Sequence, residues 1–325
     1  MKELEIYCLN TRSKHSYPMG TSLLEICKDL DVETENMVCG AIVNHQVREL
    51  SFRLVKPKRV EFIDVSHPDG IRMYIRSLIF VLYAATKEIY PHVSLRIQKG
   101  ISNGYFCELT GFGREITQQD IELIKKEMRN LIAKEIPFIK KGMLTEDAVE
   151  HLMQEGLEDK AMLFEQQGHL FTSLYYLGDL GNYFYGHLLP STGYLSIFGL
   201  EKYYDGLLLR IPDTDNFNEL MEAPEQKKLF EIYQEHKDWA ALLDVSTISH
   251  LNEYTIKRQG GHIIKIAEAL HEKKIAEIAN TIHSRNGDIK VVLVAGPSAS
   301  GKTTFSKRLG VQLAVNGMHP FQISL

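Results

Sequence analysis

The chain has 325 residues, of which 44% are hydrophobic and 24% charged, and this balance excludes a wholly disordered or fibrous protein. Its net charge of −5 means that the protein as a whole does not attract nucleic acid or anionic lipid electrostatically, although a local basic patch is compatible with this charge. The longest apolar run, residues 78–85, is far shorter than the roughly 20 residues of a membrane helix. An acidic start and four cysteines without a Cys-x-x-Cys pair predict a cytoplasmic protein with reduced thiols.

Residues 1–66 predict a small α+β domain with one helix that Thr21 or Ser22 can cap. The order of its elements resembles the TGS domain, a ubiquitin-like module shared by threonyl-tRNA synthetases and some GTPases. The resemblance implies binding or regulation without catalysis. The run at residues 56–59, Lys-Pro-Lys-Arg, is either an RNA-facing patch or, as we favour, a solvated loop. Strand patterns lie at residues 4–9, 14–17, 38–43, 47–50 and 60–65.

Residues 67–223 predict a second α+β domain, built on a long amphipathic helix that ends at Pro91. Thr117 and Asp120 have the spacing of a capping box for another helix, and Thr145 begins a third. Three separated motifs resemble the second, editing-type domain of threonyl-tRNA synthetase. They are Glu88-Ile89-Tyr90-Pro91-His92-Val93, Ile101-Ser102-Asn103-Gly104-Tyr105-Phe106 and Pro190-Ser191-Thr192-Gly193.

The resemblance implies a cleft formed by a His-x-x-x-His pair and a Cys-x-x-x-His pair, which bind a metal ion and edit. In this chain the four positions are occupied by Phe80, Ala84, Phe184 and Leu188. None of these side chains offers a lone pair to a metal, so we expect no synthetase-type deacylation. His187 lies one residue from an expected ligand, but a lone histidine among apolar residues is more often structural.

Residues 224–286 predict a helical connector with helices at residues 225–243 and 262–284. The spacing in the second helix predicts one inward face. Its members would be Ile263, Ile266, Ala267, Leu270, Ile278 and Ile282.

Residues 287–325 contain a phosphate-binding loop motif between a predicted strand, residues 289–295, and a predicted helix, residues 302–315. Glycines allow backbone N–H groups to surround a phosphate, and the helix N-terminus adds partial positive charge. The motif assigns Lys302 to the β- and γ-phosphates as the catalytic cation, and the Thr303 hydroxyl to Mg²⁺. The predicted nucleotide-binding residues are Gly296, Ser298, Ala299, Ser300, Gly301, Lys302, Thr303 and Thr304.

The loop resembles that of the uridine kinase and phosphoribulokinase group, and the whole arrangement resembles bacterial uridine kinase relatives with an N-terminal extension. This resemblance implies transfer of the ATP γ-phosphate to a nucleoside 5′-hydroxyl, with ATP and Mg²⁺ as cofactors. The first β-loop-α-β of a P-loop α/β domain would end in a strand at residues 321–325, so we expect an inactive N-terminal portion of a longer kinase.

The predicted edge of this unfinished sheet favours disorder or intermolecular pairing from residue 289 onward. Two alternatives to the kinase stay open: an RNA-binding or tRNA-editing-derived module, and a TGS-bearing P-loop GTPase. The sequence leaves the oligomeric state open.

Overall fold

The computed structural model describes residues 2–285 and 287–323 and divides into two compact units, Met1–Glu235 and His236–Leu325. Helix α6 (Lys227–Leu242) crosses the division. None of the helices in the described part of the chain combines the length and apolar character needed to cross a bilayer.

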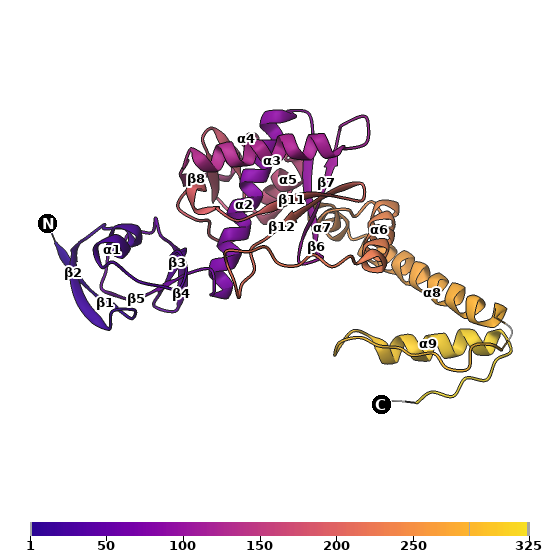
Figure 1. Ribbon diagram of the computed structural model, residues 1–325. Helices are drawn as coiled ribbons and strands as arrows, with labels where there is room; N and C mark the ends of the chain where they lie inside the picture. The colour runs from indigo at the N-terminus through magenta and orange to yellow at the C-terminus, as the bar shows by residue number, and fades with distance from the viewer. Residues whose placement is uncertain (1, 286, 324–325) are drawn as a thin grey trace. The chain divides into compact units, whose positions relative to one another are not determined.

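The first unit begins with a five-stranded mixed sheet in the order β2-β1-β5-β3-β4, in which β1 pairs parallel to β5 and every other pair is antiparallel (Figure 1). Leu23 and Ile26 of α1 are fully buried against this sheet. Ser22 caps α1 in a reciprocal box with Glu25, which confirms one of the two predicted caps. The elements are β1 (Glu3–Cys8), β2 (Ser13–Pro18), α1 (Leu23–Asp29), β3 (Gly40–Val43), β4 (Gln46–Glu49) and β5 (Lys58–Ile63).

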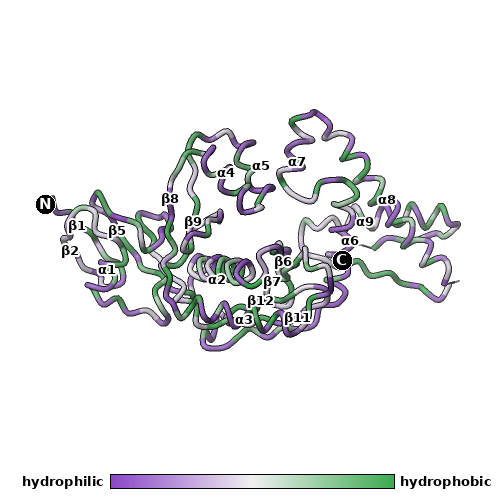
Figure 2. Tube along the Cα trace, turned by 90° about the horizontal axis from the view of Figure 1, so that it is seen from above, coloured by the Kyte–Doolittle hydropathy of each residue, from purple (hydrophilic) through white to green (hydrophobic). Residues whose placement is uncertain are grey.

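The rest of the first unit is built around the long helix α2 (Pro68–Ile89), which is buried along most of its length. Figure 2 looks nearly along α2 and shows β8 and β9 on one side of it and β6, β7 and β12 on the other. The strands form an antiparallel sheet in the order β11-β12-β7-β6 and a smaller one in the order β10-β9-β8.

The other elements of this region confirm the predicted α+β pattern. They are β6 (Ser94–Ile101), β7 (Gly104–Thr110), α3 (Gln118–Ala133), β8 (Phe138–Leu144), α4 (Thr145–Gln154), α5 (Glu158–Gln167), β9 (Phe171–Leu177), β10 (Leu180–Asn182), the 3₁₀ turn η1 (Thr192–Tyr194), β11 (Gly199–Tyr203) and β12 (Gly206–Arg210).

The Pro-Ser-Thr-Gly motif has a structural role in this fold. Thr192 is fully buried; its hydroxyl donates to the Leu131 carbonyl (2.7 Å) and accepts from the Ile136 amide (2.9 Å). A Cβ at Gly193 would come within 2.9 Å of the Glu135 side chain. The motif therefore fastens the end of α3 to the start of β8.

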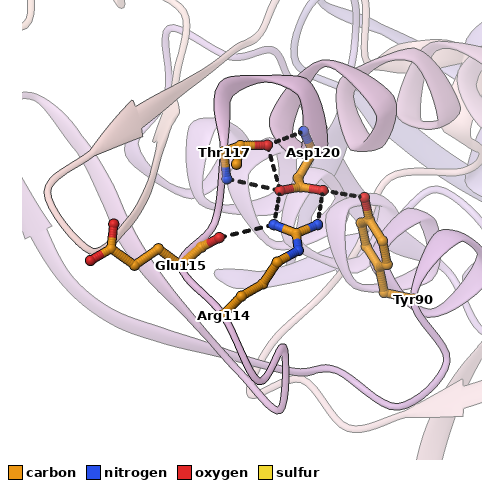
Figure 3. Close-up of polar contacts among 5 residues, drawn as sticks. All are labelled: Tyr90, Arg114, Glu115, Thr117 and Asp120. Carbon is orange, nitrogen blue, oxygen red and sulfur yellow. Dashed lines mark hydrogen bonds and ion pairs between the residues drawn. The ribbon is translucent and has the colours of Figure 1, made fainter.

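The first motif contributes Tyr90 to a polar cluster at the start of α3 (Figure 3). Asp120 accepts two bonds of 2.7 Å from the Arg114 guanidinium, one of 2.6 Å from the Tyr90 hydroxyl, and bonds from the backbone and hydroxyl of Thr117. These donors, the guanidinium above all, hold the pKa of Asp120 well below its usual range. The predicted capping box is thereby confirmed.

The second unit is helical in its described residues and contains no strand there. Helices α8 (Gly260–Ser284) and α9 (Lys302–Val315) pack side by side (Figure 1). Glu272 bonds Arg308, and Asn280 bonds Asn316, so the two helices run in the same direction. A third helix, α7 (Ile248–Ile256), was not predicted.

Three predictions for this region are corrected. Residues 289–295 form no strand, and Leu293 is 85% exposed, because a parallel strand needs hydrogen-bonded neighbours and none is present among the described residues. Residues 321–323 are likewise not a strand, and residues 324–325 lie outside the described residues. The predicted inward face of α8 is wrong at Ile266 and Ala267, which are exposed. The residues buried along α8 are Ile263, Ile275, Ala279 and Ile282.

Candidate functional site

The resemblance to the editing-type domain implies a ligand cleft, and in this chain its four ligand positions are filled with apolar side chains. Phe80 of α2 is fully buried, with its ring centroid 5.0 Å from that of Phe184 and 5.8 Å from that of Phe138. Leu188 is 1% exposed, and Ala84 packs against the same core. Ring packing therefore occupies the space where metal ligands would converge. Across residues 2–285 and 287–323, no three His, Cys, Asp or Glu residues cluster to hold a metal ion.

A lysine borders this apolar cluster. The Lys160 ammonium, on α5, donates to Asn182 Oδ1 (2.6 Å) and to the Tyr183 carbonyl (3.4 Å), and lies 5.7 Å from the centre of the Phe184 ring. Burial lowers the pKa of Lys160 to about 8, and the neighbouring charge of Asp159 opposes this only in part. A cation with such a pKa is a common feature of functional sites.

Lys160 contacts the start of a loop, residues 182–187, and an arginine contacts the end of that loop. Arg76 lies one turn before Phe80 on α2 and donates to the His187 carbonyl (3.4 Å). A Cβ at Gly186 would come within 2.6 Å of the guanidinium carbon, so glycine is required for this approach. Burial and the nearby charge of Arg72 lower the pKa of Arg76.

His187 itself takes a structural partner. Its Nδ1 lies 3.4 Å from a carboxylate oxygen of Glu49, which is on β4 of the first sheet, and the Tyr175 hydroxyl donates to the same oxygen. Burial acts to raise the pKa of Glu49, but the hydrogen bonds from His187 and Tyr175 lower it overall. This partly buried network joins the five-stranded sheet to the β10-β9-β8 sheet, and His187 lies in it beside Glu49.

The β8–β9 ribbon presents lysines over tyrosine rings. Exposed Lys140 lies 5.4 Å from the centre of the Tyr175 ring, and exposed Lys141 lies 4.4 Å from that of Tyr176. Phe171, at the start of β9, is 67% exposed. Successive strand residues face opposite sides, so the two pairs lie on opposite faces of the ribbon, and Tyr175 is only 3% exposed. The exposed cations suit the phosphates of a nucleic-acid strand.

The phosphate-loop residues lie together before α9. Ala299 and Gly301 have left-handed φ values of 60° and 81°, and Gly301 directly precedes the helix. Lys302 folds back so that its ammonium donates to the Pro297 carbonyl (2.7 Å). Gly296, Ser298, Ser300, Thr303 and Thr304 are all exposed along this loop and first turn. The loop thus precedes a helix N-terminus, but the Ser300 amide donates to the Pro297 carbonyl (3.3 Å), and none of the described residues forms a strand that supports the loop.

Comparison with known proteins finds similarity over more than half of the chain. It is 27% identical over 201 residues to a threonine–tRNA ligase of Polynucleobacter asymbioticus, covering 61% of the chain and 31% of that protein. It is 25% identical over 190 residues to the enzyme of Thermotoga neapolitana (58% of the chain, 29% of that protein), and 26% identical over 188 residues to threonine–tRNA ligase 2 of Bacillus subtilis (57% and 29%).

The chain has homologues among threonine–tRNA ligases. It spans about 30% of the length of these relatives, and the likeness agrees with the predicted editing-type domain. No protein-family model matches the chain.

The prediction of a nucleoside kinase is wrong on these findings. The relatives are threonine–tRNA ligases, and no finding supports a uridine kinase or a phosphotransferase. The kinase interpretation depended on a short loop motif, whereas the ligase relationship covers more than half of the chain. The alternative of a synthetase-derived module agrees better with the comparisons.

Sequence reasoning missed Arg76, Lys160 and Glu49. Lys160 follows Glu158 and Asp159, and such a charged run is typical of a solvated helix face. Arg76 lies one turn before Phe80 on α2. The i, i+4 spacing could therefore have predicted that Arg76 lies beside Phe80.

Proposed function

We propose that the first unit is an RNA-binding module derived from a tRNA synthetase, one that binds without hydrolysing. The relatives are named as ligases that act on tRNA. The observation that carries the proposal is that packed apolar side chains, Phe80 and Phe184 among them, occupy all four positions at which the resemblance implies ligands. This packing removes metal-assisted chemistry while leaving the surfaces around the cleft available for binding.

The two exposed lysines of the β8–β9 ribbon, Lys140 and Lys141, support the proposal. Their cations are exposed, and each is within cation–π distance of a ring. The overall charge of −5 does not favour nucleic acid, so binding must come from such a local surface.

The first prediction tests this surface with a gel shift on tRNA at several salt concentrations. We expect Lys140→Ala with Lys141→Ala to weaken binding about tenfold and to make its salt dependence less steep, because each lost phosphate contact removes counterion release. The matched control is Lys126→Ala with Arg129→Ala, which removes two exposed cations from α3. Absence of binding at low salt, or an equal loss in the control, would refute the proposal.

A second candidate function is nucleotide binding by the loop at residues 296–304. The left-handed backbone at Ala299 and Gly301 and the N-terminus of α9 support it, since a curved loop before a helix N-terminus suits a phosphate. We propose ATP with Mg²⁺ as the ligand, with Lys302 at the phosphates and Thr303 at the metal.

The second prediction concerns Lys302. We expect Lys302→Ala to lower the affinity for Mg²⁺–ATP, measured by calorimetry, at least tenfold. Lys307→Ala, an exposed lysine on the same helix, should leave it unchanged. Equal effects of the two substitutions would mean that the loop does not bind the nucleotide.

A further inference from the structure

One face of the β8–β9 ribbon is closed at one end and open at the other. Three cross-strand pairs share this face, because opposed residues and every second residue along a strand point to the same side. The pairs are Lys140 with Tyr175, Gly142 with Ser173, and Leu144 with Phe171. Tyr175 is 3% exposed, whereas Leu144 is 41% and Phe171 67% exposed. The face is therefore open at the end that carries Phe171.

The Phe171 ring has no packing role in the part of the chain that the structure describes. It belongs to none of the hydrophobic clusters there, and neither do its exposed neighbours Leu144 and Leu170. A protein interface buries about 800 Å² on each partner, far more than three side chains present. A single exposed ring instead suits a flat aromatic ligand that stacks on it.

The charges along this face separate its two ends. Exposed Lys140 lies at the closed end, over the Tyr175 ring. Glu49 also lies at that end, but its carboxylate already accepts from Tyr175 and contacts His187. At the open end, the exposed acids Glu146 and Asp147 follow Leu144 directly, in the first turn of α4. A phosphate is therefore attracted to Lys140 and repelled from the end that carries Phe171, where an uncharged ring fits better.

The path between the two ends is clear. Residues 140 and 144 are four strand steps apart, about 14 Å. Between them Gly142 has no side chain, and a Cβ built there would meet no atom closer than 3.9 Å. A chain with a phosphate at one point and a free aromatic ring farther along can lie across this surface. In duplex RNA the faces of the bases are hidden in the stack, so a single strand fits and a duplex does not.

We infer that this face is a stacking site for an unpaired base of single-stranded RNA, with the base on Phe171 and a backbone phosphate at Lys140. The inference rests on the proposed function and names the part of the RNA that this surface selects. It also separates the two ribbon lysines, because Lys141 lies on the opposite face and does not contact the same short strand.

The experiment uses the full chain carrying Lys302→Ala, which removes the cation of the phosphate loop. Affinities are measured for a short single-stranded oligoadenylate and for inorganic polyphosphate, which has the charges but no bases. The test variant adds Phe171→Ala, and the conservative variant adds Phe171→Tyr. The matched control adds Leu170→Ala, which removes the neighbouring apolar side chain, 71% exposed.

Phe171→Ala should weaken oligoadenylate binding about tenfold and leave polyphosphate binding unchanged, because only the base stacks on the ring. Phe171→Tyr and Leu170→Ala should keep both affinities. The melting temperature of Phe171→Ala should equal that of the parent, since the ring is exposed. Lys140→Ala should weaken the binding of both probes, and Lys141→Ala of neither.

Three results would overturn the inference. They are an equal loss for both probes in Phe171→Ala, unchanged oligoadenylate binding in that variant, and self-association of the parent that Phe171→Ala abolishes, which would assign the ring to an interface between copies. A parent that binds tRNA and oligoadenylate, with Phe171→Ala unchanged, refutes the inference alone. A parent that binds neither RNA refutes the proposed function as well.

Discussion

At the scale of residues, the chain shows how far motif spacing reaches. The positions of Phe80 and Phe184 follow from counting along two motifs, and the structure places both rings in one cluster. The partial burial of Arg76 and Lys160 could not be found in this way, because it depends on which elements the fold packs around them. Spacing predicts which side chains meet on one element, while desolvation depends on every element around them.

The third prediction concerns Asp120 at the start of α3. Asp120→Asn should lower the free energy of unfolding by about 2 to 3 kcal/mol, because the charge-assisted bonds from Arg114 and Tyr90 are weakened. Asp147→Asn, in the exposed first turn of α4, is the matched control and should have little effect. Urea unfolding measures both.

The same carboxylate makes the effect of Asp120→Asn depend on pH. Folding lowers the pKa of Asp120, so its stabilisation is complete above the ordinary carboxyl pKa near 4 and declines as the pH falls below it. The difference between wild type and Asp120→Asn should therefore be constant from pH 5 to 7 and shrink below about pH 4. A constant difference down to pH 2 would contradict the assigned role.

At the scale of elements, the sequence predicted where most helices lie better than it predicted which elements they pack against. The apolar stripe of α8 predicts a helix by its periodic spacing. However, α9 covers only the half of α8 that contains Ile275, Ala279 and Ile282, so Ile266 is left exposed. Similarly, an apolar run at residues 289–295 is necessary for a buried strand but not sufficient, because the ladder needs neighbours. Disorder or intermolecular pairing was expected from residue 289 onward. Disorder is wrong for α9, which packs on α8, and intermolecular pairing stays a prediction.

The fourth prediction tests the packing of α9 on α8. Leu313 is 6% exposed, and Leu313→Ala should destabilise the helix pair by about 2 to 4 kcal/mol through lost burial and a cavity. Val315→Ala, at a position that is 76% exposed, should change little. Hydrogen exchange of peptides from residues 302–315 measures the effect, and equal exchange in the two variants would show that the helices do not pack as described.

At the scale of the whole molecule, the two units have separate cores, and the first contains most of the buried apolar residues. The resemblance of three motifs to a threonyl-tRNA synthetase domain agrees with the comparisons, whereas the bounds 67–223 stay a prediction. The function went wrong because a nine-residue loop at residues 296–304 received more weight than the larger domain before it. Short phosphate loops recur on many proteins, so such a loop predicts a ligand better than a reaction.

The fifth prediction follows from the separate cores. The chain has a single tryptophan, Trp239, which lies in the second unit. During urea unfolding, its fluorescence should report the second unit, while circular dichroism reports both, and the two midpoints should differ. Coincident midpoints would mean that the units unfold as one cooperative structure.

The ring cluster of Phe80, Phe138 and Phe184 also has an evolutionary consequence. A single Phe80→His substitution would bury an imidazole without a hydrogen-bond partner. It would lower the free energy of unfolding by about 1 to 3 kcal/mol while no second metal ligand is present. Each of the four positions faces the same penalty alone, and only their joint reversal would rebuild a metal centre. Under the proposed function, the packing that stabilises the fold therefore also opposes the stepwise introduction of a metal centre.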